Sequence, residues 1–222
     1  MAGRYQSGTK DTRIRFITVL RYDGRVPRPK THDDALRVRL LDRAGELLSS
    51  EGPSALSLRR LAADVNTSTT AVYSLFGGKP ALLDALYDEG FRRFGERLAT
   101  VPETDDPVED LINIALTYRE SALQDRQFYV VMFSKVVPDF TPTTETYIAA
   151  SGTFVPVVKT VQRAIDAGAF VDEAPEVIGL ALWSISHGLV SLEIYGILPP
   201  GLEIAPVFER AVRASADGWR KR

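Results

Sequence analysis

The chain has 222 residues, of which 45% are hydrophobic and 25% are charged, and this composition is typical of a folded globular protein. It contains no cysteine, which excludes a disulfide scaffold, a thiolate metal site and a cysteine nucleophile. Two histidines, His32 and His187, are too few for a histidine-rich catalytic or zinc site. We therefore expect no metal, no cofactor and no enzymatic activity.

The formal net charge of −2 hides a strong asymmetry along the chain. Residues 1–30 carry +6, residues 31–97 carry −1 and residues 98–222 carry −7. A basic start followed by an acidic remainder indicates a polyanionic partner at one end of the chain. No segment approaches the roughly 18 consecutive apolar residues of a membrane span, so we predict neither a transmembrane helix nor a secretory signal. We expect a cytoplasmic protein, associated with the nucleoid if its polyanionic partner is DNA.

Residues 1–30 are interpreted as a basic N-terminal arm. Glycine, serine, threonine and arginine dominate there, and Pro27 and Pro29 precede the first helical pattern. Asp23-Gly24 is a hairpin-turn dipeptide that follows a run of β-forming residues, so a short ribbon is one possibility. A mobile tail without a function is an equally good interpretation.

From Asp33 onward the apolar residues recur at helical spacing. Leu40, Leu41, Ala44 and Leu47 illustrate the pattern, and no sustained alternation of period two follows it. The acidic segment 101–107 separates a first domain, 31–100, from a second, 101–222. The sequence predicts an all-α fold of about nine helices, at 33–51, 57–65, 68–76, 80–98, 107–124, 126–137, 153–167, 174–196 and 204–219, with an irregular loop at 138–146.

The predicted helices 57–65 and 68–76 have the dimensions of a helix-turn-helix. Ser57 and Ser68 are good N-caps, and Asn66 tolerates the left-handed conformation that a tight turn requires. In the second helix an apolar face can lock onto a support, while Thr69 and Thr70 lie on the opposite face. Such a pair offers its second helix to the major groove of DNA, although two helices at the corner of a bundle would show the same pattern.

The stretch from Leu58 to Leu83, LRRLAADVNTSTTAVYSLFGGKPALL, resembles the DNA-binding domain of the TetR family of bacterial transcriptional regulators. The matching positions are Leu61-Ala62, Ser68, Val72-Tyr73, Phe76, Lys79 and Leu82-Leu83. Asn66 stands where the family usually has glycine, and Thr69 where lysine is common. The resemblance implies that Thr69, Thr70 and Ala71 face base edges and that Tyr73 and Lys79 contact phosphates, which leaves any guanine preference to Arg59, Arg60 or the arm.

The segment ALWSISHGLVSLEIYG, with Trp183, His187 and Gly188, resembles the Trp…His-Gly type of TetR C-terminal domain, which implies dimerisation and effector binding. A stripe of small residues there and an apolar stripe on the last helix favour a four-helix interface between two copies. For this interface we predict Ser184, Gly188, Ser191, Phe208, Val212 and Ser215. For an effector pocket we predict Tyr118, Phe128, Met132, Phe133, Phe154, Trp183 and His187.

Several of these assignments have a structural alternative. Any single aromatic residue of the pocket set could belong to an ordinary core, and a lone His187 is better explained as a hydrogen-bonded structural residue than as a ligand. The charge of −7 slightly favours a neutral or cationic effector. The prediction is a homodimeric repressor that is released from a palindromic operator by a small, mostly apolar molecule, and the alternative is an effector-independent DNA-binding or protein-interaction dimer.

Overall fold

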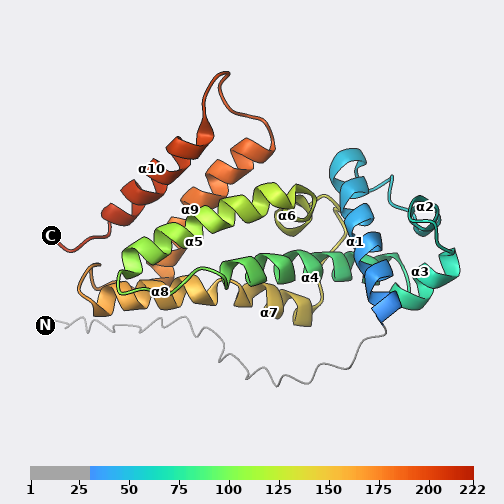
Figure 1. Cartoon of the computed structure of the whole chain (residues 1–222), viewed down its shortest axis with the longest axis horizontal. Coiled ribbons are helices and arrows are strands. Elements are labelled where there is room, and N and C mark those ends of the chain that lie inside the picture. Colours follow the sequence, from blue (N-terminus) through green and yellow to red (C-terminus); the bar gives the residue numbers. More distant parts are fainter. Residues whose placement is uncertain (1–30) are drawn as a thin grey trace, which may run out of the picture.

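The computed structural model describes residues 31–222, which fold into ten helices (Figure 1). The only β-pairing in this range is an isolated bridge between Phe170 and Arg220. The predicted arm at 1–30 lies outside the described residues. The helices are α1 (Thr31–Glu51), α2 (Leu58–Asp64), α3 (Thr69–Phe76), α4 (Lys79–Leu98), α5 (Pro107–Gln124), α6 (Arg126–Phe133), α7 (Thr144–Gly152), α8 (Val155–Asp166), α9 (Pro175–Ile194) and α10 (Ile204–Asp217).

The all-α prediction is confirmed, and each of the nine predicted helices is present. The apolar stripe of the first helix is buried as expected, since Leu40, Leu41 and Ala44 are fully inaccessible to solvent. The tenth helix, α7, begins inside the predicted loop 138–146, where the Thr143 side chain caps its first turn by accepting a hydrogen bond from the Thr146 amide. Conversely, α6 ends at Phe133 rather than at residue 137, because Ser134 takes an extended conformation.

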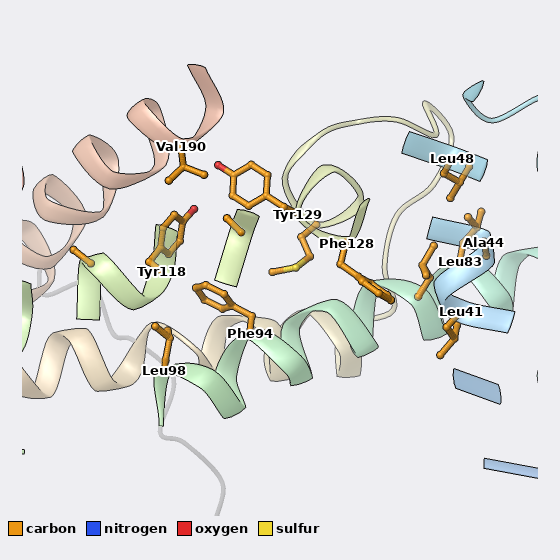
Figure 2. Packing of buried hydrophobic residues seen from close by; sticks show 14 of the residues in the cluster. Leu41, Ala44, Leu48, Leu83, Phe94, Leu98, Tyr118, Phe128, Tyr129 and Val190 are labelled. Carbon is orange, nitrogen blue, oxygen red and sulfur yellow. The ribbon is translucent and has the colours of Figure 1, made fainter. Parts of the chain in front are cut away.

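Helix α4 joins the two halves of the molecule. It starts beside α1 and α3 and continues into the body, where it packs on α5, α6 and α7 (Figure 1). The buried side chains form one continuous core that runs from Leu41 of α1 past Phe94 of α4 to Val190 of α9 (Figure 2). Of the first three helices, α1 packs directly on α6 of the body, α3 packs on the start of α4, and α2 packs on α1 and α3.

Helix α9 is the most apolar element and passes the length and composition test for a membrane span, with a mean hydropathy of 1.6. One such helix is weak evidence, because a helix in the interior of a globular protein passes the same test. Its inner side packs on α5, α8 and α10. Only 28% of its most apolar 18-residue window is buried, however, so its outer side carries exposed apolar residues.

Candidate DNA-binding surface and effector cavity

The helix pair α2–α3 is fixed at both starts by serine caps. The Ser57 hydroxyl accepts a hydrogen bond from the Arg60 amide at 3.2 Å, and the Ser68 hydroxyl accepts one from the Ala71 amide at 3.1 Å. Asn66 in the connection has a φ of 56°, which confirms its predicted left-handed conformation. Both short helices thus start at a defined point, as docking into a DNA groove requires.

Helix α3 turns one face to the protein and the other to solvent. Val72 and Phe76 are buried, and the guanidinium of Arg37 lies 5.6 Å from the centre of the Phe76 ring. On the other face Ser68, Thr70 and Tyr73 are exposed, whereas Thr69 and Ala71 are partly exposed. The residues that the resemblance assigns to base edges are therefore placed where DNA could reach them.

Lys79, predicted as a phosphate contact, is also a structural residue. Its ammonium donates hydrogen bonds to the main-chain oxygens of Leu56 at 2.8 Å and Pro53 at 3.2 Å. These bonds tie the α1–α2 connection to the start of α4 and occupy two of the three ammonium protons. The third proton remains for a phosphate, so the predicted contact is compatible with the second role.

The two arginines of α2 differ in their availability. Arg60 forms a two-pronged ion pair with Glu51, at 2.7 and 2.9 Å, and so fastens the start of α2 to the end of α1. Arg59 is exposed and forms no ion pair with any residue in the described range. Since a guanidinium must present two donors to read guanine, Arg59 is the better placed of the two.

Aromatic side chains gather around His187 in the body. Five of the seven residues predicted for the pocket meet there: Tyr118, Phe133, Phe154, Trp183 and His187. Tyr129 completes this cluster, because its hydroxyl lies 3.0 Å from His187 Nδ1 and 3.0 Å from Ser191 Oγ. The sequence analysis missed Tyr129, although its position four residues before Phe133 on one helix could have indicated it.

The polar groups of the His187 cluster bond to one another. The Tyr118 hydroxyl lies 2.9 Å from His187 Nδ1, and burial lowers the pKa of His187 while it raises those of Tyr118 and Tyr129. A neutral imidazole that accepts a phenolic hydrogen bond satisfies both groups without a ligand. This geometry favours the structural interpretation of His187.

A cavity with a volume of about 510 Å³ lies beside this cluster. It is lined by α1, α4, α6, the segment 134–142 and α7. Of the predicted pocket residues, Met132 and Phe133 line it; Phe128 instead lies in the core, with the Arg93 guanidinium 4.4 Å from its ring centre (Figure 2). The lining residues are Leu48, Leu83, Tyr87, Val131, Met132, Phe133, Ser134, Lys135, Val136, Val137, Phe140, Thr141, Pro142, Thr144 and Tyr147.

One carboxylate connects the two walls of this cavity. Asp84 of α4 accepts hydrogen bonds from the Thr143 amide at 2.9 Å and from the hydroxyls of Thr143 at 3.2 Å and Thr146 at 2.8 Å. Thr146 is buried and its bond to Asp84 is part-buried, whereas the two bonds from Thr143 are exposed. We call these three residues the Asp84 clamp, which holds the start of α7 against the part of α4 nearest the helix-turn-helix.

The outer side of α9 is an unpaired apolar surface. Ser184 and Gly188 are exposed there, and a Cβ atom added at Gly188 would meet nothing within 4 Å. Phe208 and Val212 of α10, predicted for the dimer interface, are buried inside the subunit, because α10 turns its apolar stripe inward onto α5 and α9. Ser191 bonds to Tyr129, and Ser215 is half-buried. The exposed apolar residues on α9 are Val177, Leu180, Ile185, Leu192 and Tyr195.

Comparison with known structures supports the fold. The chain is similar to a protein of unknown function from Rhodococcus sp. RHA1, at 27% identity over 84% of this chain and 96% of that one, with a TM-score of 0.73. It is also similar to the TetR-family regulator PfmR from Thermus thermophilus, at 20% identity over 83% of this chain and 100% of that one, with a TM-score of 0.67. A TetR-family regulator from Haemophilus influenzae is similar at 17% identity over 87% of this chain and 100% of that one, with a TM-score of 0.69. No curated protein matches the chain.

Two family matches cover separate parts of the chain. Residues 40–86 match the bacterial regulatory proteins of the tetR family, and residues 111–215 match the tetracyclin repressor-like C-terminal domain. Together they span 152 of the 222 residues, and the first contains the whole α2–α3 pair. The chain therefore belongs to the TetR family and is a DNA-binding transcriptional regulator rather than an enzyme.

Proposed function

We propose that this regulator is a repressor that binds a palindromic operator as a homodimer and leaves it when a small, mostly apolar molecule enters the 510 Å³ cavity. One observation carries the proposal: the cavity has walls from both halves of the molecule. Leu48, Leu83 and Tyr87 belong to the helices that hold the helix-turn-helix, and the opposite wall belongs to α6, the 134–142 segment and α7. Its volume lies within the range of small-molecule sites.

The dimer follows from the way in which a helix-turn-helix reads DNA. Two helix-turn-helix domains, held about one helical turn of DNA apart (roughly 34 Å), contact two half-sites, so the protein needs a stable two-fold partner. The exposed face of α9 supplies a self-complementary surface: apolar residues at both ends and small residues at its middle, Ser184 and Gly188, where two helices could approach closely.

Coupling between cavity and DNA would pass through α4. A ligand can shift a conformational equilibrium only if it contacts the two states differently. A molecule in this cavity touches α4 on one side and the segment that the Asp84 clamp fastens to α4 on the other. A changed separation of these walls would displace α4, which begins at Lys79, immediately after the recognition helix.

DNA recognition would rest on few contacts. Thr69, Thr70 and Ala71 would meet base edges, Tyr73 and the third proton of Lys79 would meet phosphates, and Arg59 would be the guanine reader. We also keep the assignment of the C-terminal domain to the Trp…His-Gly type; the packing of Trp183 on His187, with ring centres 5.5 Å apart, supports it.

Selection of binding sites from fragmented genomic DNA with the full chain tests this function. The expected result is a palindromic motif with two half-sites and a stoichiometry of one dimer per site. Thr70→Ala should change the preferred base at one position of each half-site, whereas Tyr73→Phe should weaken binding to all selected sites about equally. Binding that depends on salt but not on sequence would refute the repressor proposal.

A further inference from the structure

The lining of the 510 Å³ cavity carries a single charge. Among its lining residues Lys135 is the only charged side chain, and no aspartate or glutamate lines it. Lys135 is exposed, which puts its ammonium at the cavity mouth, and it takes part in no ion pair with the described residues. The cavity lining therefore offers one cation that is not engaged in an ion pair with the described residues.

Tyr87 and Tyr147 add two phenolic hydroxyl groups to the cavity lining. Burial and the nearby Tyr147 hydroxyl both raise the pKa of Tyr87, so this phenol keeps its proton at neutral pH. Neither phenolic hydroxyl has a hydrogen-bond partner among the described residues. A ligand that supplies acceptor atoms would satisfy these donors and the ammonium together.

Four carboxylates directly adjoin lining residues along the chain but do not line the cavity: Asp84, and the exposed Asp88, Asp139 and Glu145. Asp84 follows Leu83 of the lining, but its oxygens accept the three hydrogen bonds of the Asp84 clamp, which stabilise its charge. The rest of the cavity surface is mainly apolar, formed by leucine, valine, methionine, proline and phenylalanine side chains. Such a surface suits a hydrocarbon body.

We propose that the effector is an apolar molecule with a single carboxylate, whose hydrocarbon body fills the cavity and whose anionic head pairs with Lys135. The proposal rests on the assignment of this cavity as the effector site. It reverses the expectation from the net charge of −7 on residues 98–222. Distant charges are screened beyond a Debye length of about 8 Å at physiological salt, whereas a charge at the cavity mouth acts at contact distance.

A series of probes with one hydrocarbon chain and different heads tests the ligand class. Decanoate, 1-decanol and decylamine are titrated into the full-length dimer below their micellar concentrations, and binding is followed by calorimetry. An exposed ion pair changes affinity by up to about 5-fold. We expect decanoate to bind about 5-fold more tightly than decanol, decylamine to bind most weakly, and the advantage of decanoate to shrink at high salt.

Matched variants locate the effect. Lys135→Gln should bring decanoate to the affinity of decanol and leave decanol unchanged. Lys159→Gln should change neither, because Lys159 is an exposed lysine that lines a separate cavity of about 200 Å³. Val136→Trp, which fills the 510 Å³ cavity from its wall, should abolish binding of all three probes.

Different results would refute the proposed ligand class and the proposed regulatory function. The ligand class is overturned if decanol or decylamine binds as tightly as decanoate, if Lys135→Gln leaves the advantage of decanoate intact, or if no probe binds. Decanoate that binds through Lys135 but leaves operator affinity unchanged would support the ligand class and refute the regulatory role of the cavity. Absence of a selected palindrome would refute the operator proposal whatever the probes do.

Discussion

Lys79→Met is the most informative single change, because this lysine has a structural role and a separate, proposed role as a phosphate contact. Methionine keeps the apolar stem of the side chain and removes the ammonium. The variant therefore loses the 2.8 Å bond to the Leu56 oxygen and the 3.2 Å bond to the Pro53 oxygen with little loss of packing. It also loses the one proton that remains for a DNA phosphate.

The expected loss of stability follows from these two bonds. A hydrogen bond with a charged partner contributes about 1.5–3 kcal/mol, and this group is only part-buried, so the shorter bond is assigned about 1.5 kcal/mol. The longer bond is assigned about 0.5 kcal/mol. The free energy of unfolding should thus fall by about 2 kcal/mol, measured by urea denaturation at one fixed protein concentration because dimer stability depends on concentration.

The second readout is the salt dependence of operator binding. Loss of one phosphate contact lowers the slope of log K against log salt by about 0.9 for each head on the DNA. Lys159→Met removes an exposed ammonium far from α3 and should change neither quantity. An unchanged free energy of unfolding in Lys79→Met would refute the structural role, and an unchanged salt slope with reduced stability would refute the phosphate contact alone.

Three further changes test other parts of the molecule. Gly188→Phe should leave the subunit folded and yield monomers in size-exclusion chromatography with light scattering. The control Gly152→Phe on α7, where an added Cβ also meets nothing within 4 Å, should remain dimeric. A dimeric Gly188→Phe would contradict the α9 interface. Burial lowers the pKa of His187 below its ordinary value of 6.5. The contribution of the neutral His187 side chain to the free energy of unfolding is therefore complete above pH 6.5 and is lost as the pH falls toward the lowered pKa. Urea denaturation of His187→Gln between pH 7.5 and about 5 should therefore show a weaker pH dependence than wild type, and an equal dependence would argue against a buried neutral imidazole. Asp84→Ala should lower the free energy of unfolding by about 2 kcal/mol and accelerate hydrogen–deuterium exchange of the amides at the start of α7. Asp88→Ala, which changes an exposed aspartate one turn later, should do neither. Amide protection that survives in Asp84→Ala would rule out the clamp.

Much of the fold could be predicted because its signals are local. The serine caps of α2 and α3, the left-handed Asn66 and the buried stripe of α1 each depend on a few neighbouring residues, and the structure agrees with all of them. The resemblance to the TetR family was readable for the same reason, since its motif occupies one continuous stretch. Helix α7 was missed although Thr143 is a good cap, because its apolar pattern is weak.

The candidate sites depended on contacts that spacing alone does not define. Helical periodicity identified Phe208 and Val212 as an apolar stripe, but only the packing of α10 showed that this stripe faces its own subunit. The sequence also could not place Lys79 against main-chain oxygens more than twenty residues away, nor reveal the 510 Å³ cavity beside the His187 cluster. The sequence by itself determined nine of the ten helices among residues 31–222 and the family, since these follow from neighbours along the chain. Tertiary structure alone decided which apolar faces are covered and where space remains, because both depend on how distant helices pack.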